Sequence, residues 1–120
     1  MLIHVLKSKV HRARVTAANL NYEGSLTMDR ALMDRAGFVA YEKILCSNMA
    51  NGERFETYLI PGEPGAGDIV LNGAAALLGK AGDMLTIMSF TEIDVTHAKF
   101  WKPRVLVLGE KNVIVNERGT

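Results

Sequence analysis

The sequence predicts a mainly β domain, a small barrel whose connections carry short helices. Three observations favour this fold class: many short β-branched or alternating runs, turn dipeptides between them, and only two segments with helical spacing. At 120 residues the chain is long enough to bury one core and too short for two, so a single domain spanning 1–120 is expected. Hydrophobic residues make up 48% and charged residues 22%, which is typical of a folded globular chain.

The expected strands are short and spread along the whole chain. Their residue ranges are 2–6, 10–16, 44–49, 54–60, 69–71, 84–90, 105–108 and 113–115. The dipeptide of Asn51 and Gly52 predicts a type I′ turn, because both residues tolerate positive φ. We therefore expect the strands on either side of it to pair as a hairpin.

Two helices are expected. Asp29 can cap a helix in which Leu32 and Ala36 repeat at helical spacing, and Gly37 can end it in the left-handed conformation. The second helix is short, residues 73–78, and also ends at a glycine. No repeat or low-complexity linker divides the chain, so these helices are expected to lie in the connections of one barrel.

The net charge and the single cysteine limit which cellular compartment and which binding partners we expect for this protein. The net charge of +1 gives no overall basic footprint for nucleic acid. Cys46 is the single cysteine and cannot form an internal disulfide, so we expect a core side chain in a reducing cytoplasm. The first fifteen residues are too charged for a signal peptide, and no apolar run reaches membrane-spanning length, so a membrane partner is not expected.

Metal and phosphate motifs are weak in this sequence. His4, His11, His97 and Cys46 do not fall at ligand spacings, so no metal site is predicted. The glycine-rich segment at 61–68 lacks the lysine and the following helix of a phosphate cradle, and we interpret it as a plain connection.

Two stretches can bind a small anion. After Asn72, the small residues at 73–75 open a helix, where free backbone N–H groups can meet an anion, although tight helix packing explains them equally well. In the strand at 54–60, alternation places Arg54 and Tyr58 on one face and Thr57 on the other. Arg54 can hold a carboxylate with two hydrogen bonds, although a solvated strand face is the commoner explanation.

The dipeptide of Gly24 and Ser25 interrupts a strand-like run. A serine hydroxyl can attack the preceding carbonyl if that peptide is strained and its oxygen is held by donors, which moves the acyl group from nitrogen to oxygen. Glycine favours this attack because it has no Cβ and adopts backbone angles that other residues avoid. Elimination of the ester would split the chain and, after hydrolysis, leave a pyruvoyl group at position 25.

The residues around this dipeptide resemble those of a known family. The stretch KVHRARVTAANLNYEGS, followed by the Asn-Gly hairpin, RFETY and VLNGAAA, is similar to the pyruvoyl-dependent aspartate decarboxylases from the N-terminus to about residue 108. The resemblance implies a double-psi β-barrel, a homotetramer with sites between subunits, and decarboxylation of L-aspartate to β-alanine through a Schiff base, for pantothenate synthesis. It also implies self-cleavage into a 1–24 β chain and a 25–120 α chain, with a covalent pyruvoyl cofactor and neither pyridoxal phosphate nor a metal.

The family's functional positions carry over where this sequence holds the same residue. Ser25 is similar to the serine that becomes the pyruvoyl group, and cleavage is implied between Gly24 and Ser25. Thr57 resembles the hydroxyl that polarises the Gly24 carbonyl and also lines the substrate site, and Asn72 resembles a residue that steadies processing or substrate. A maturation factor is a possible partner, and the short C-terminal tail departs from the family.

The implied substrate site combines cationic, aromatic and backbone groups. Arg54 resembles the ligand of the substrate carboxylate, and Tyr58 the group that protonates Cα after carbon dioxide leaves. The other implied binding residues are Lys9, His11, Tyr22, Gly73, Ala74 and Ala75.

Two other functions fit the residues alone. An N-terminal-nucleophile hydrolase would also cleave itself but would keep a free hydroxyl and amine. An uncleaved small barrel could instead bind RNA or a partner through its basic first strand, which holds Lys7, Lys9, His11, Arg12 and Arg14.

Overall fold

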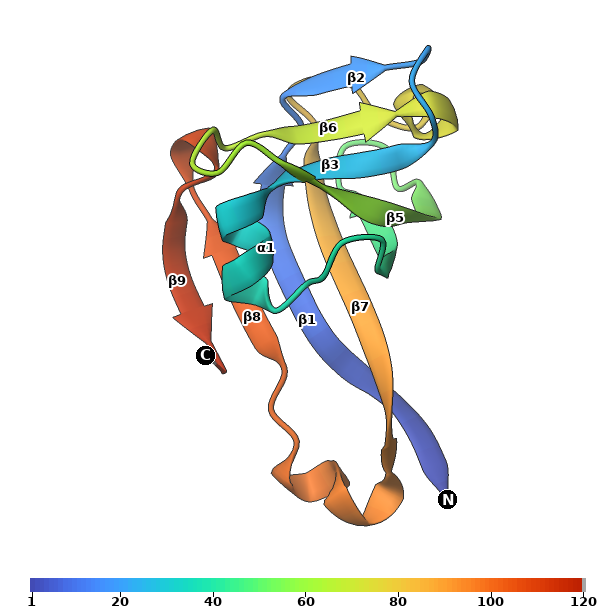
Figure 1. The fold of residues 1–120 in the computed structure, drawn as a ribbon, viewed down its shortest axis with the longest axis vertical. Coiled ribbons are helices and arrows are strands. Elements are labelled where there is room, and N and C mark those ends of the chain that lie inside the picture. Colours follow the sequence, from blue (N-terminus) through green and yellow to red (C-terminus); the bar gives the residue numbers. More distant parts are fainter. Residues whose placement is uncertain (120) are drawn as a thin grey trace.

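The computed structural model describes residues 1–119. Within them, strands dominate and the helices are short, which confirms the mainly β class with helices in the connections (Figure 1). The strands are β1 (Leu2–Arg14), β2 (Ala17–Asn19), β3 (Ser25–Asp29), β4 (Lys43–Asn48), β5 (Arg54–Gly62), β6 (Ile69–Asn72), β7 (Met84–Asp94), β8 (Arg104–Leu108) and β9 (Ile114–Arg118). The helical segments are α1 (Arg30–Ala36) and the 3₁₀ turns η1 (Gly73–Leu77), η2 (Val95–Phe100) and η3 (Glu110–Asn112).

The strands are hydrogen-bonded in the order β2-β6-β3-β5-β4-β7-β1-β8-β9. The pairs β1 with β8, β2 with β6, and β3 with β5 are parallel, and the remaining neighbours are antiparallel. In Figure 1, β2, β6, β3 and β5 cross above the long β1 and β7 strands, with α1 beside them. This wrapping of strands around one core fits the small barrel expected from the sequence.

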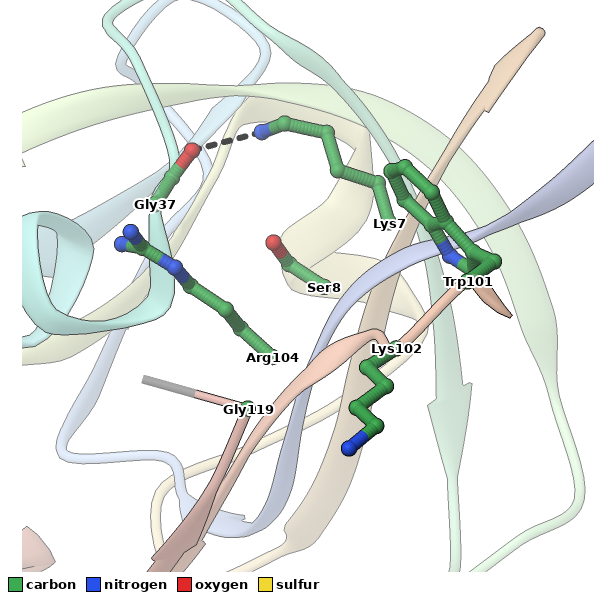
Figure 2. Close-up of a pocket in the computed structure, with 7 residues that line it drawn as sticks. All are labelled: Lys7, Ser8, Gly37, Trp101, Lys102, Arg104 and Gly119. Atoms are coloured by element: carbon green, nitrogen blue, oxygen red, sulfur yellow. Dashed lines mark hydrogen bonds between the residues drawn. The ribbon is translucent and has the colours of Figure 1, made fainter. Parts of the chain in front are cut away.

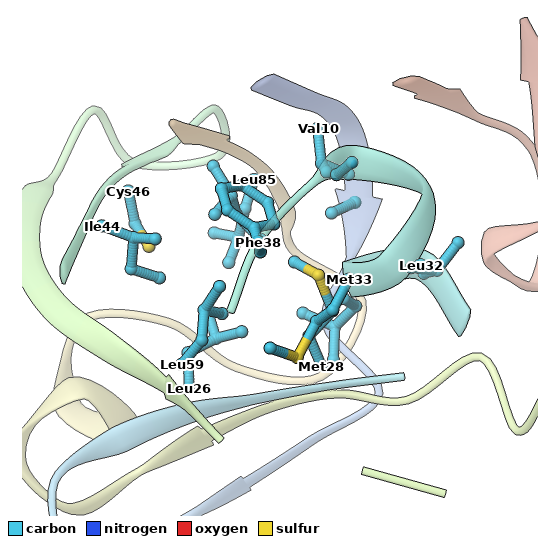
Figure 3. Packing of buried hydrophobic residues seen from close by; sticks show 14 of the residues in the cluster. Val10, Leu26, Met28, Leu32, Met33, Phe38, Ile44, Cys46, Leu59 and Leu85 are labelled. Carbon is cyan, nitrogen blue, oxygen red and sulfur yellow. The ribbon is translucent and has the colours of Figure 1, made fainter. Parts of the chain in front are cut away.

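The core lies between these strands and α1. Leu26, Met28 and Leu59 are completely buried, and Figure 3 shows them grouped with Phe38 and Leu85. Because side chains alternate across a strand, burial of Leu26 and Met28 turns the side chains between them in β3 away from the core. This alternation sets the direction of the functional hydroxyl groups described below.

Cys46 is part of the same core. Burial raises the pKa of its thiol to about 12, so the side chain stays protonated and packs as a small apolar group. This confirms the expectation of a core residue.

Helix α1 begins and ends as expected. The Asp29 carboxylate accepts a hydrogen bond from the Ala31 N–H at 2.8 Å, and Gly37 ends the helix at φ 79°. Asp29 also accepts hydrogen bonds from the N–H groups of Gly65 and Gly67 at 3.0 and 2.9 Å. These bonds hold the glycine-rich segment against the start of α1, where it serves as a connection between strands. Burial alone would raise the pKa of Asp29, but these backbone donors hold it below the ordinary value of 3.8.

The hairpin of β4 and β5 is confirmed, but the type I′ turn is wrong. Ser47 pairs with Arg54, and five residues, 49–53, connect the strands. Only Gly52 of the expected turn dipeptide has positive φ, at 77°. Asn51 instead accepts a hydrogen bond from the Glu53 N–H through its side chain, which stabilises a longer loop that local turn rules did not predict.

Other boundaries also differ from the sequence expectations. The first two expected strands form one continuous β1, because bulges after Leu6 and Val10 absorb the break in alternation. The short strands β2 and β3 and the turns η2 and η3 were not predicted, and η1 is 3₁₀ rather than α-helical. β2 and β3 gain their order from pairing with β6 and β5, which are distant in sequence.

Candidate functional site

Ser25 lies at the start of β3, directly after the loop at 20–24, and is completely buried. It pairs with Asn72 in the antiparallel ladder of β3 and β6. The Asn72 side-chain amide donates to Ser25 Oγ at 3.0 Å, and Ser25 Oγ donates to the Glu23 carbonyl oxygen at 3.4 Å. The hydroxyl group is therefore shielded from water and held from two sides.

Asn72 joins two hydroxyl groups of β3. Its Nδ2 donates to Ser25 Oγ and also to Thr27 Oγ1, at 2.9 Å. Only 3% of the Asn72 surface is exposed, so these bonds replace water as the partners of the amide. Sequence reasoning missed Thr27, although its position two residues after Ser25 places both side chains on one face of a strand.

Gly73 lies in contact with the backbone before Ser25. Its φ is +65°, and an added Cβ would lie 2.7 Å from the Cα and N of Gly24 and 2.9 Å from the Tyr22 carbonyl oxygen. A side chain at position 73 would therefore displace the loop. The predicted small-residue segment does lie beside the Gly24–Ser25 bond, with Ala74 exposed and Ala75 buried.

Gly24 itself does not use the conformational freedom of glycine. It is outside the set of positive-φ glycines, and an added Cβ would have no atom within 4 Å. The role of Gly24 in the attack by Ser25 stays a prediction. The glycine that the packing requires here is Gly73.

Thr57 and Tyr58 face opposite sides of β5 because successive side chains alternate along a strand. Leu26 pairs with Leu59 in the parallel ladder of β3 and β5. The pairing of β3 with β5 begins at this point, so neither Thr57 nor Tyr58 is part of it. Among the described residues no hydrogen bond joins Thr57 to Gly24, and the roles of Thr57 and Tyr58 stay predictions.

Arg54 lies in a row of polar side chains that crosses β5, β4, β7 and β1, which we call the Arg54 row. Its Nε donates to Ser47 Oγ at 3.1 Å, and Ser47 pairs with Thr86 on β7. Thr86 Oγ1 lies 3.3 Å from His11 Nδ1 on β1. Lys9 lies two residues before His11, so alternation places it on the same face as this row.

The environment of His11 favours its neutral form. Partial burial is the main cause that lowers the pKa of His11 below its ordinary value of 6.5, and the charges of Lys9 and Arg12 lower it further. At neutral pH the imidazole is therefore uncharged and can donate or accept a hydrogen bond. The lowered pKa disfavours a charged His11 among the cationic surroundings expected for Arg54.

One chain does not bring the two groups together. Arg54 and Tyr58 are four residues apart on β5, about 13 Å along the strand, and Arg54 is hydrogen-bonded to β4 while Ser25 begins β3. Tyr22 lies in the loop before Gly24 and is 51% exposed. Among the described residues no hydrogen bond joins Arg54 to Ser25 or Asn72.

The comparison with known proteins decides the family. A sequence model described as "Aspartate decarboxylase" matches residues 1–115, which is further than the resemblance noted above. The chain belongs to the aspartate decarboxylase family.

Curated relatives give the same result. An aspartate 1-decarboxylase of Caldicellulosiruptor saccharolyticus is 51% identical over 115 residues, which cover 96% of this chain and 90% of the relative. One of Prosthecochloris aestuarii is 49% identical over 112 residues, covering 93% and 87% of the two chains. One of Parabacteroides distasonis is 52% identical over 106 residues, covering 88% and 91%.

A separate basic hollow of about 330 Å³ contains none of the site residues predicted from the family (Figure 2). Lys7 Nζ donates to the Gly37 carbonyl oxygen and forms an ion pair with Glu42 at 2.9 Å. The Arg104 side chain lies against Gly37 from the other side. Because these cations lie at the C-terminal end of α1, they stabilise the partial negative charge of the helix end.

Within residues 1–119 no helix has both the length and the apolar character that crossing a bilayer requires.

Proposed function

We propose that this chain is a self-processing carboxy-lyase that converts L-aspartate to β-alanine and carbon dioxide, the step that supplies β-alanine for pantothenate synthesis. The observation that carries the proposal is the family match over residues 1–115 together with a buried Ser25 whose hydroxyl is held by Asn72. The mature enzyme would consist of chains 1–24 and 25–120. Assignment to the cytoplasm is part of this proposal, and so is a maturation factor as a partner that processing does not require.

Processing would begin with attack of Ser25 Oγ on the Gly24 carbonyl carbon. A C–O bond forms, the C–N bond breaks, and the hydroxyl proton ends on the freed nitrogen. Loss of the Ser25 Cα proton with cleavage of the Cβ–Oγ bond releases Gly24 as a carboxylate, and water then replaces the nitrogen, which leaves as ammonia. The Thr57 hydroxyl would polarise this carbonyl group, as the resemblance to the family implies.

The surroundings of Ser25 fit a pyruvoyl group at that position. The Asn72 amide, which now donates to a hydroxyl oxygen, would suit a ketone oxygen equally well. When formed, the group supplies an electron sink that draws electrons from the bond to the departing α-carboxylate.

The remaining residues bind and orient the substrate. Arg54 is always charged and can hold the side-chain carboxylate of aspartate with two parallel hydrogen bonds. Tyr58 carries a phenolic proton that it would give to Cα after carbon dioxide leaves, as the resemblance to the family implies. The other residues proposed to line the site are Lys9, His11, Tyr22, Thr57, Asn72, Gly73, Ala74 and Ala75.

The separation of Arg54 from Ser25 within one chain supports a site between subunits of a homotetramer. Copies of the chain would contribute the Arg54 row to one side of each site and the Ser25 group to the other. A mixed-variant experiment tests this arrangement. Arg54→Ala and Ser25→Ala chains are each expected to be inactive alone, whereas coexpression should restore part of the activity because some interfaces pair two intact halves. No recovery in verified mixed oligomers would argue against the shared site.

Intact-mass measurement tests processing directly. The purified wild-type chain should give two species, 1–24 and a C-terminal chain that aspartate and borohydride label at position 25, whereas Ser25→Ala should give one intact chain. Labelling requires a ketone, so an N-terminal-nucleophile hydrolase would remain unlabelled. A single intact wild-type chain in the assembled protein would refute the decarboxylase mechanism.

A further inference from the structure

The Asn72 amide group has two hydrogens, and both are used inside the protein. One bond reaches Ser25 Oγ at 3.0 Å and the other reaches Thr27 Oγ1 at 2.9 Å. Ser25 and Thr27 share one face of β3, which lies between β6 and β5 (Figure 1). Thr27 is therefore the second anchor of the amide that contacts the reacting hydroxyl.

The orientation of Thr27 is fixed by its methyl group. Thr27 pairs with Ile60 on β5, and its Cγ2 lies 2.9 Å from the point that a Cβ on Gly62 would occupy. The absence of a side chain at Gly62 gives this methyl group its space. Because a β-branched side chain has few rotamers, seating the methyl beside Gly62 directs the hydroxyl toward Asn72.

We propose that Thr27 is a positioning residue for self-cleavage, which it promotes by holding the Asn72 amide against Ser25 Oγ. This inference rests on the proposed self-processing. The step affected is the one in which Ser25 Oγ bonds to the Gly24 carbonyl carbon, the C–N bond breaks and the hydroxyl proton passes to the nitrogen. Without the Thr27 hydroxyl, a buried amide hydrogen loses its acceptor, and the amide turns to find another partner.

Thr27→Val and Thr27→Ser separate the hydroxyl from the packing. Valine keeps the shape and removes the acceptor, so cleavage of freshly purified precursor should slow at least about tenfold. A tenfold change corresponds to about 1.4 kcal/mol, which is within the cost of leaving a buried donor unpaired. Serine keeps the acceptor and should recover most of the wild-type rate. Thr91→Val, the same change on β7 away from the site, is the matched control and should cleave at the wild-type rate.

The rate of appearance of the 25–120 chain, followed by intact mass, is the measurement. Wild-type-like cleavage of Thr27→Val, or equal slowing of the valine and serine variants, would overturn the role of the hydroxyl. Wild-type protein that never cleaves would instead overturn the proposed function itself. The folding of each variant is checked by thermal unfolding in the Ser25→Ala background, which cannot cleave.

A second variant decides the question if Thr27→Val does not fold. Gly62→Ala leaves the Thr27 hydroxyl in the chain but crowds its methyl group, so cleavage should again slow at least about tenfold. Cleavage of a folded Gly62→Ala protein at the wild-type rate would overturn the proposal.

Discussion

Replacing Gly73 by alanine would place a methyl group where the backbone of the preceding loop now lies. The new Cβ would be 2.7 Å from the Cα and N of Gly24 and 2.9 Å from the Tyr22 carbonyl oxygen. These atoms are backbone and cannot turn aside as a side chain can. Because Gly73 is anchored directly after β6, we expect the loop at 20–24 to move and to shift the Gly24–Ser25 peptide away from Asn72.

The magnitude has two parts. An alanine at the φ of Gly73, +65°, costs about 1–2 kcal/mol of folding free energy because its Cβ crowds the following carbonyl. The collision adds to this, and its effect on the reacting peptide should slow cleavage at least about tenfold, equivalent to about 1.4 kcal/mol in the barrier. Both the folding free energy and the rate of processing should therefore fall measurably.

Gly52→Ala is a matched control for the backbone strain. Gly52 has φ +77°, but an added Cβ there would meet no atom within 4 Å. Chemical denaturation in the Ser25→Ala background should show that both glycine variants lower the free energy of unfolding by the backbone cost. Intact-mass measurement with Ser25 present should show slow cleavage only for Gly73→Ala. Equal cleavage rates for the two variants would refute the steric reasoning.

The remaining predictions concern the reaction and the charges around it. Arg54→Ala should lose turnover of aspartate in a coupled β-alanine assay while Ser25 is still converted; loss of cleavage instead would count against its role in substrate binding. NMR should find the His11 pKa below 6.5, and Lys9→Met should raise it, because one of the charges that disfavour protonation is removed. The contribution of neutral His11 to the free energy of unfolding should fall as the pH drops below 6.5, because the unfolded chain takes up the proton at a higher pH than the folded chain does. A measured His11 pKa above 6.5 would contradict this prediction. Asp29→Asn should cost about 1–3 kcal/mol by denaturation, and the contribution of the Asp29 charge in the wild type should vanish only as the pH falls through its lowered pKa, below 3.8. Retained stability in Asp29→Asn would show that the backbone donors need no charged acceptor.

Local patterns predicted the elements whose order depends on neighbouring residues. Asp29 and Gly37 marked the ends of α1 because a carboxylate cap and a left-handed glycine act within a few residues. Alternation likewise placed Arg54 and Tyr58 on one face of β5. The short strand β3 escaped prediction because its order depends on pairing with β5 and β6, which follow much later in the chain.

The sequence by itself determined the mainly β class, the helix ends, and the family to which the chain belongs, because these follow from short-range patterns and from characteristic motifs. Only the tertiary structure decided that Gly73 rather than Gly24 is sterically constrained, and that Thr27 shares the Asn72 amide with Ser25. It also separated the Arg54 row from the Ser25 group. The physical reason is that contact distances between strands depend on register and twist, which pair residues far apart in sequence and which no local pattern specifies.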